Sequence, residues 1–326
     1  MKHARLTRIG VDELDDELAS ALAAIDNAAL DGVPLRQHTG RTFQLECQDR
    51  YGEGPDQALW LAHAGDELVG YAALSLNRFA NLDGAKVLGA VHPDHRRRGI
   101  GRALVTAAEA ATDRPRLRAP AWVGTAGEHA VPALGYVRSH SHHVRRLDLH
   151  DLPSPELVAA ADEASRDYDV ERIAGPCPDE LLGDMQVLRE AMNDAPEPGE
   201  PETFPPDRIR AEEESLARGH QTAYTVVARH RASGEPAGLS FVCVHELRPL
   251  IAAQEDTSVV RGHRGHRLGL RMKLDLLDWL RAERSDVESV DTWNAPENAP
   301  MIAINDALGC RIVAETIRFT KTRGAG

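Results

Sequence analysis

Apolar residues follow two different spacings along this chain, and blocks of the two spacings alternate. In residues 12–30, Leu14, Leu18 and Leu22 recur every four positions, which predicts an amphipathic helix. Residues 57–77 instead form two strand-like apolar runs around Ala-Gly-Asp-Glu, which predicts a β-hairpin. The chain is therefore expected to contain both helices and strands.

The blocks occur twice in the same order. Each half has a first strand, one helix in the first half or two in the second, a hairpin, a strand, a loop rich in arginine and glycine, a helix, a strand, a short helix and a closing strand. This order predicts an α/β fold in the broad sense, a mixed α+β arrangement with helices flanking each sheet. The strands expected after the hairpins lie at 84–91, 116–123 and 141–149, and again at 254–260, 287–293 and 311–321.

The repeat is also visible in the sequence itself. VHPDHRRRGIGRAL, from residue 91, aligns without a gap on VVRGHRGHRLGLRM, from residue 259, at an offset of 168 positions. A period of this size predicts two globular domains rather than a solenoid. We expect domains at 1–152 and 167–326, joined by a linker at 153–166 where proline and acidic residues interrupt the strand patterns. The Pro- and Glu-rich residues 194–207 are expected to form a long mobile loop over the second domain's site.

Composition restricts the class of protein. The 326 residues suffice for about two domains, and no apolar run approaches the roughly 18 residues that span a bilayer. The first 16 residues contain no apolar signal-peptide core, so we expect a cytoplasmic protein with no membrane partner. We expect it to be a monomer or a homodimer. The four cysteines form no C-x-x-C pair, which argues against zinc ribbons and disulfide frameworks.

The formal charge of −13 argues against a nucleic-acid partner and favours cationic small molecules. The two arginine clusters are local exceptions in this acidic chain. A basic, glycine-containing turn between a strand and a helix forms an anion site, because its N–H groups and the helix dipole attract negative charge. The candidate cofactor-binding residues are Val91, Arg96, Arg97, Arg98, Gly99, Ile100 and Gly101, and then Val259, Arg264, Gly265, His266, Arg267, Leu268 and Gly269.

The spacing Arg-x-x-Gly-x-Gly, from Arg96 to Gly101, resembles the acetyl-CoA loop of the GNAT family, the Gcn5-related N-acetyltransferases. The order of elements in both halves is similar to that of the family, and so are the turns ALGYV and ALGCR. The resemblance implies two tandem GNAT domains, each with a twisted, mostly antiparallel sheet. The layout is similar to that of tandem members such as mycothiol synthase. It also implies acetyl-CoA as co-substrate and direct attack of an amine on its thioester.

The family's acid and base residues are not found at their usual positions. A tyrosine acid is expected four residues before the glycine of the last turn, where this chain has Val131 and Asn305. The usual carboxylate base position holds Ala85 and Ala253, and Glu255 is the nearest substitute on the same strand face. The resemblance therefore gives Glu255, Asn298 and Asn305 as candidate catalytic residues. Each also has a structural interpretation, as a solvent-facing strand residue or a cap.

The two halves differ in what they offer. The first loop has both glycines, whereas the second has Arg267 in place of Gly99, so cofactor binding is better supported in the first half. The polar residues Asn294, Asn298 and Asn305 favour the second half for catalysis. We therefore interpret the second domain as active and the first as a degenerate CoA-binding unit, and the opposite assignment stays open.

Two functions follow from the sequence. The leading one is an acetyl-CoA-dependent N-acetyltransferase acting on a primary amine of a small cationic molecule. The alternative, motivated by the missing tyrosines, is a non-catalytic acyl-CoA-binding or regulatory tandem GNAT. We expect no metal site, because His140, His142 and His143 lie on one predicted strand with no cysteine or carboxylate nearby.

Overall fold

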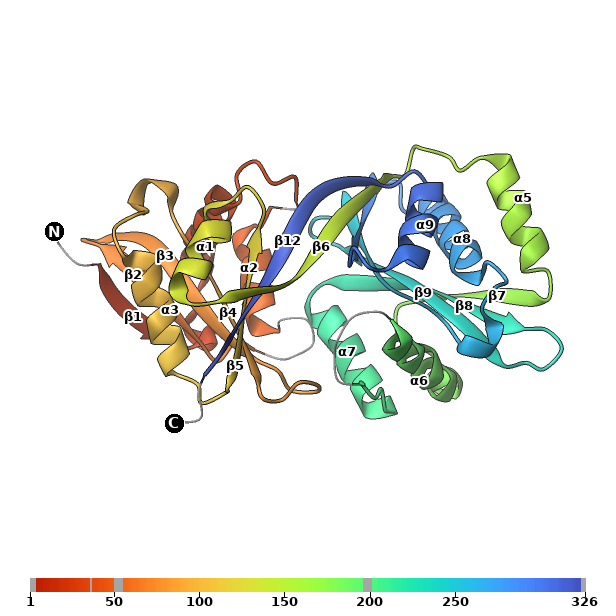
Figure 1. The fold of residues 1–326 in the computed structure, drawn as a ribbon, viewed down its shortest axis with the longest axis horizontal. Helices are drawn as coiled ribbons and strands as arrows, with labels where there is room; N and C mark the ends of the chain where they lie inside the picture. The colour runs from red at the N-terminus through yellow and green to blue at the C-terminus, as the bar shows by residue number, and fades with distance from the viewer. Residues whose placement is uncertain (1–3, 36, 50–54, 196–200, 324–326) are drawn as a thin grey trace. The chain divides into compact units, whose positions relative to one another are not determined.

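A computed structural model describes residues 4–35, 37–49, 55–195 and 201–323 (Figure 1). The chain divides into two compact units, and neither is continuous in sequence. Unit 1 consists of Met1–Ser141 and Ala314–Gly326, and unit 2 of His142–Val313. Each unit is a sheet with helices packed on both faces.

In unit 1 the strands lie in the order β1-β2-β3-β4-β5-β12, and all neighbours are antiparallel except β4 and β5. Alternate residues of β2 face opposite sides: Trp60 joins the core beneath α3, while Leu59 joins the core beneath α1 and α2. The elements of unit 1 are β1 (Arg5–Ile9), α1 (Asp16–Ala29), α2 (Gly40–Gln48), β2 (Ala58–Ala64), β3 (Glu67–Leu76), β4 (Gly84–Val91), α3 (Ile100–Ala110), β5 (Arg116–Trp122), α4 (Ala126–Ala130) and most of β12 (Arg311–Thr322).

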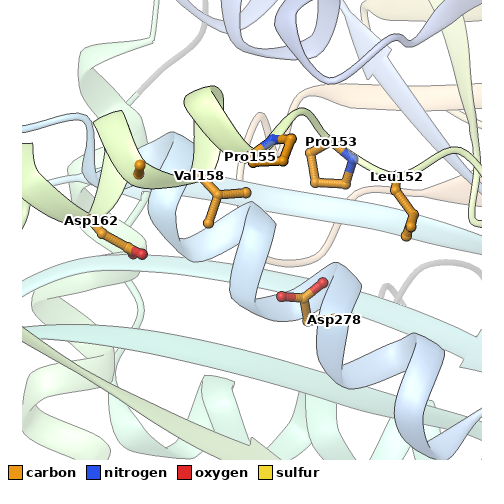
Figure 2. Close-up of a pocket in the computed structure, with 7 residues that line it drawn as sticks. Leu152, Pro153, Pro155, Val158, Asp162 and Asp278 are labelled. Carbon is orange, nitrogen blue, oxygen red and sulfur yellow. The ribbon is translucent and has the colours of Figure 1, made fainter.

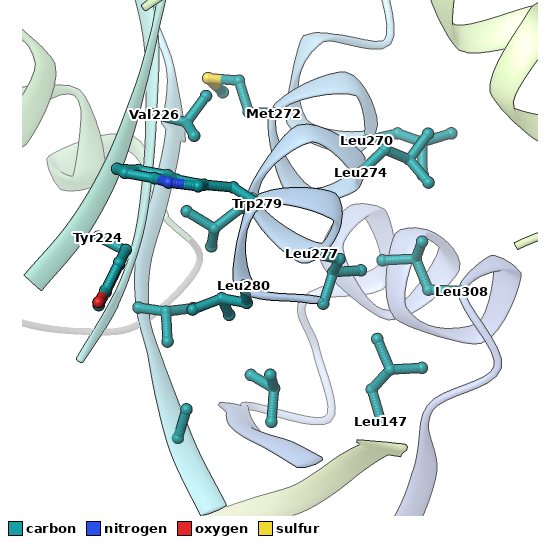
Figure 3. Close-up of a cluster of buried hydrophobic side chains, with 14 of the residues drawn as sticks. Leu147, Tyr224, Val226, Leu270, Met272, Leu274, Leu277, Trp279, Leu280 and Leu308 are labelled. Atoms are coloured by element: carbon teal, nitrogen blue, oxygen red, sulfur yellow. The ribbon is translucent and has the colours of Figure 1, made fainter. Parts of the chain in front are cut away.

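Unit 2 repeats this plan with the strand order β6-β11-β10-β9-β8-β7, in which only β10 and β11 are parallel. Its larger core lies beneath α8, where Trp279 packs edge-on against Tyr224 with ring centroids 5.0 Å apart (Figure 3). The elements of unit 2 are most of β6 (Val137–Asp148), α5 (Pro155–Ala164), β7 (Tyr168–Ala174), α6 (Leu182–Glu190), α7 (Pro206–Arg218), β8 (Gln221–His230), β9 (Pro236–His245), β10 (Ile251–Val259), α8 (Leu268–Glu283), β11 (Ser289–Asn294) and α9 (Ala299–Ala307).

The two halves of the chain exchange their closing strands. In unit 1, β5 pairs with β12 from the end of the chain, and Ile317 and Phe319 of β12 are buried in the core beneath α3. Arg323 donates hydrogen bonds to the carbonyl oxygens of Glu109 and Thr112 at the end of α3. In unit 2, β11 pairs with β6 from the first half. Each sheet is thus completed by a strand distant in sequence.

The division expected from the sequence differs from this one. Residues 142–152, expected in the first domain, lie in unit 2, and the last strand lies in unit 1 rather than with the second half. The expected linker at 153–166 contains α5, whose Ala161 is fully buried against the core beneath α8. A strand pattern shows that a strand forms but not which sheet it joins, so the exchange was not predicted.

The expected loop at 194–207 is only partly described, because 196–200 lie outside the described residues. Phe204 is buried, and it lies between the guanidinium groups of Arg189 and Arg208, at 4.5 and 4.0 Å from its ring centroid. The part of the loop next to α7 is therefore packed against neighbouring side chains at Phe204, and the expected mobility of the loop stays a prediction. Among the described residues, no helix combines the length and the hydropathy that a membrane span requires.

We expect Phe319→Ala to destabilise unit 1 by roughly 3–5 kcal/mol, since it removes a buried aromatic ring supplied by the exchanged strand. Hydrogen exchange of amides in α3 and β5 measures the loss within unit 1. Ile312→Ala on the same strand is the control, because Ile312 is 52% exposed. Unchanged exchange in α3 and β5 would show that β12 does not support this core.

Candidate functional site

The two arginine- and glycine-rich loops have the same backbone conformation. Two positions in each loop have left-handed φ angles: +63° at Arg97 and +82° at Gly99 in unit 1, and +89° at Gly265 and +52° at Arg267 in unit 2. Each loop therefore contains one glycine and one arginine at these positions, in opposite order. A left-handed arginine costs roughly 1–2 kcal/mol, so each loop retains one strained residue.

This backbone changes the interpretation of Arg267. The sequence suggests that its side chain spoils the second loop, but Arg267 has the same left-handed conformation as Gly99 and precedes its helix in the same way. Apart from the glycine itself and the residues adjoining it in the chain, no described residue has an atom within 4 Å of a Cβ built on Gly99 or Gly265. Glycine is therefore favoured there by φ, not by crowding from neighbouring residues, and both loops keep the geometry of an anion site.

Both loops also present unpaired backbone donors. The first hydrogen bonds of α3 and α8 run from Ala103 to Gly99 and from Arg271 to Arg267. The N–H groups of 97–102 and 265–270 have no acceptor within the described part of the chain. Helix N-termini with free N–H groups bind phosphate oxygens, so the geometry fits the pyrophosphate of an acyl-CoA.

The arginines of the loops have distinct roles. Arg96 donates from Nε to the carbonyl oxygen of Val91 at 3.2 Å, and Arg264 does the same to Val259 at 3.1 Å. These two side chains brace their loops. Arg97 is exposed, and its side chain has no partner among the residues that the structure describes, which leaves it available to a ligand.

A carboxylate distinguishes the second loop. Asp194, just after α6, accepts hydrogen bonds from Arg261 at 2.9 Å and from Arg264 at 2.8 Å. The hydrogen bond from Arg261 is the main cause that lowers the pKa of Asp194, and Arg264 adds to it. Asp194 thus partly neutralises the second loop, whereas in the described part of unit 1 no carboxylate pairs with Arg96, Arg97 or Arg98.

In unit 2 the strand that leads into this loop contains a β-bulge. Gln254 of β10 pairs with Val242 and Thr257 pairs with Ser240, so two residues of β10 stand opposite the single residue Phe241. Gln254 donates from Nε2 to the carbonyl oxygen of Phe241 at 2.7 Å, which stabilises the bulge. A bulge disrupts the regular ladder and leaves a backbone group free for other partners.

The same strand separates from its parallel neighbour at the bulge. β10 pairs with β11 only over Ile251–Gln254. Beyond Thr292, β11 continues to Asn294 without pairing to β10. In unit 1, β4 also leaves β5 after three paired residues, but its register with β3 is continuous from Ala85 to Val91. Both units have diverging strands, and among the described residues only β10 carries the bulge at this place.

The bulge positions the carboxylate that the sequence favoured. Glu255 and Asp256 are its two residues. Asp256 forms an ion pair with Arg189 of α6, 3.1 Å from Oδ2 to Nε. Glu255 is exposed to solvent. Glu255 therefore lies where β10 and β11 separate, which the sequence did not predict, and its role as a base stays a prediction.

The two candidate asparagines have structural partners. Asn298 caps α9, accepting a hydrogen bond at Oδ1 from the N–H of Met301 at 3.3 Å. Asn305 on α9 is fully buried and bonded at both ends of its amide: Lys273 Nζ donates to its Oδ1 at 2.9 Å, and its Nδ2 donates to Asn294 Oδ1 at 2.6 Å. Asn305 is enclosed, so it acts on any ligand only through Asn294.

Lys273 is the residue that the sequence analysis missed. It lies on α8 and is only 4% exposed, among leucines and Met272. Burial lowers its pKa to about 8, since a charged amine is poorly stabilised away from water. One signal was available in the sequence, because a lysine at position 273 falls on the apolar face of its predicted helix.

A shallow open groove lies elsewhere in unit 2, between the start of α5 and α8 (Figure 2). Its volume is about 400 Å³, and it is lined by Leu152, Pro153 and the first turns of α5. Its two carboxylates, Asp162 and Asp278, are paired with Arg271 and Arg281. The groove therefore presents no free charge for a ligand.

The histidines are placed as the sequence predicted, on a strand. His142 and His143 lie on the part of β6 in unit 2, and His140 precedes them on the same strand. Within the described ranges, no group of three or more histidine, cysteine or acidic side chains is placed to hold a metal ion.

Comparisons with known proteins agree with this geometry. The Acetyltransferase (GNAT) family model matches residues 27–136, which include the first loop. Mycothiol acetyltransferase of Streptomyces avermitilis is 40% identical over 142 residues, 42% of this chain and 44% of that protein. Mycothiol acetyltransferase of Salinispora tropica is 36% identical over 159 residues, 47% of each chain. The matched segments thus span less than half of each curated relative.

Solved structures extend the likeness to the whole chain. A tandem GNAT protein from the clavulanic acid biosynthesis pathway is similar over 99% of both chains, with 27% identity and a TM-score of 0.78. A GCN5-related N-acetyltransferase from Sphaerobacter thermophilus, 16% identical, shares the fold over 97% of this chain and 95% of its own with a TM-score of 0.69. The predicted fold class, two tandem GNAT-type units, is confirmed.

We expect Gly99→Ala and Gly265→Ala each to destabilise its unit by about 1 kcal/mol or more, because alanine resists the left-handed φ. Arg267→Gly should be neutral or stabilising for the same reason. Chemical denaturation measures these changes. Gly262→Ala is the control within the second loop, since Gly262 lacks a left-handed φ and has open space around it. An equal loss in Gly262→Ala would contradict the conformational argument.

We expect Asp194→Asn to strengthen CoA binding at the second loop several-fold, because it frees Arg261 and Arg264 from an internal anion. Calorimetric titration with CoA at two salt concentrations measures the effect, which should shrink at high salt. Asp169→Asn makes the same charge change at a surface ion pair with Arg231 and serves as the control. A similar gain in both variants would mean that only net charge matters.

Proposed function

We propose that this chain is an acetyl-CoA-dependent N-acetyltransferase acting on a primary amine of a small cationic molecule, because residues 27–136 match the GNAT family model and the whole chain is similar to a tandem GNAT protein. One observation in unit 2 carries the proposal. β10 bulges and separates from β11 directly before a loop whose N–H groups have no acceptor among the described residues. This arrangement offers an anion site and a nearby free edge of strand for the acyl donor.

The reaction is a direct transfer. The amine nitrogen attacks the thioester carbon, a C–N bond forms, the C–S bond breaks, and the proton lost by the nitrogen is balanced by one taken up by the thiolate of CoA. The loop N–H groups would hold the phosphates, and a backbone N–H at the bulge would polarise the carbonyl. Glu255 is the proposed acceptor of the amine proton, and Asn298 and Asn305 support the site by capping α9 and by orienting Asn294.

We assign catalysis to unit 2 and acyl-CoA binding without turnover to unit 1. Unit 1 keeps the left-handed loop and the free Arg97, but β4 has no bulge. The residue equivalent to Lys273 is Val105, and the strand register places Ala121 of β5 where β11 has Asn294. Unit 2 has the bulge and the buried amide pair. The stronger anion site and the better-equipped cleft therefore belong to different units.

The substrate class follows from charge and from the relatives. The formal charge of −13 attracts cations at long range. Two relatives are named mycothiol acetyltransferases. A panel of candidate amines should therefore contain the acceptor of such an enzyme together with polyamines and aminoglycosides. The acidic charge and the two relatives together favour a small amine as the acceptor.

We expect the protein to release CoA thiol from acetyl-CoA when a suitable amine is present, measured with a thiol reagent across this panel, and Glu255→Gln to lower kcat/KM roughly 10²–10⁴-fold, since it removes a proton acceptor. Glu297→Gln, an exposed carboxylate near α9, is the control. CoA binding without turnover on every amine would instead support the non-catalytic alternative.

A further inference from the structure

We propose that Lys273 is a positioning residue for acetyl transfer: it fixes the orientation of two side-chain amides in series, so that Asn294 presents an N–H donor to the acyl donor. This inference rests on the proposed function of unit 2. Lys273, Asn305 and Asn294 come from α8, α9 and the end of β11, and hydrogen bonds join the three side chains in that order.

The orientation follows from which groups donate and which accept. A charged lysine has three donors and no acceptor, so it contacts only the oxygen of an amide. Lys273 Nζ lies 2.9 Å from Asn305 Oδ1, which turns Asn305 Nδ2 toward Asn294. Asn294 must then accept through Oδ1, at 2.6 Å, and its own Nδ2 points away from the pair. Lys273 therefore determines the orientation of the Asn294 amide through Asn305, although the lysine itself does not contact Asn294.

The free end of this series lies at the site. Asn294 is two residues beyond Thr292, the last residue of β11 that pairs with β10, so it lies where the strands have separated. Its Nδ2 has no hydrogen-bond partner among the described residues and is not one of their fully enclosed unpaired atoms. A donor there suits an acceptor such as the carbonyl oxygen or the sulfur of a thioester.

A buried lysine with one hydrogen bond is costly for the fold alone. Transferring an amine away from water without full compensation is unfavourable, and an apolar side chain would pack better in this environment. The equivalent position in unit 1 is Val105, which packs against the core beneath α3 in the usual way. In the register of the parallel strands, unit 1 has Ala121 of β5 in place of Asn294, so the lysine and the amide that it orients are absent together.

The charge of Lys273 changes in an accessible pH range. Burial lowers its pKa to about 8, so the amine is charged below that pH and neutral above it. Cys310 is the other titratable group that acts on it, and beyond Cys310 lie Arg145 and Asp306, which form an ion pair with each other. A charged amine polarises Asn305 more strongly, so transfer should slow as pH rises through about 8.

The test measures kcat and KM for acetyl-CoA against pH in four variants. Lys273→Met should lower kcat at least roughly tenfold with little change in KM, a smaller loss than the roughly 10²–10³-fold expected on removal of a direct donor. It should also abolish the inflection near pH 8. Lys273→Arg keeps the charge and should keep most of the rate without the inflection. Asn294→Asp replaces the donor by an acceptor and should lose as much as Lys273→Met. Cys310→Ala should retain the inflection.

Two results would overturn the proposal. One is a Lys273→Met protein with wild-type kcat, and the other is an Asn294→Asp protein that remains fully active. Val105→Met, at the equivalent position of unit 1, controls for a change of packing. Side-chain amide NMR of Asn294 and Asn305 in Lys273→Met gives a readout without turnover: unchanged signals mean that the lysine orients nothing. If the wild-type protein shows no turnover, the proposed function fails, and the amide signals still decide the role of Lys273.

Discussion

A short parallel pairing is the constraint on which each unit depends. In both sheets, two parallel strands bond over three or four residues and then separate, and the strand that leaves turns through a left-handed loop into a helix. The separation exposes strand edges that a longer ladder would consume, and the loop supplies free N–H groups beside them. The bulge in β10, the polar residues of unit 2 and the arginine side chains all act at this place.

The sequence predicted the elements well and their partners poorly. The hairpins, both loops and most helices lie where periodicity placed them, because burial of one face imposes a spacing that is visible in a single strand or helix. The helices α2 and α5 were not predicted. The exchange of β6 and β12 depends on distant pairing, which no local pattern records. For the same reason the linker was expected where α5 packs, and the bulge at Glu255 and Asp256, one extra residue in a register, was not predicted.

The candidate site shows the same limit. The spacing of arginine and glycine located both loops, but it suggested that Arg267 breaks the second one, whereas the backbone accepts arginine and glycine in either order at some cost in strain. Asn305 was selected by its position relative to Gly309, and the structure places it in the interior as a link between Lys273 and Asn294. These hydrogen bonds form only because α8, α9 and β11 pack together in the folded protein. The residues are visible in the sequence, but their contacts are not.

The exchanged strand has a consequence for how the protein is made. During synthesis, β1 to β5 of unit 1 emerge first, but β12, which covers one edge of β5 and fills part of its core, is synthesised last. Until then the edge of β5 is open, with unpaired backbone groups and exposed apolar surface that favour aggregation. The nascent chain must hold an incomplete sheet while some two hundred residues follow. The first half to leave the ribosome is thus the last to finish folding.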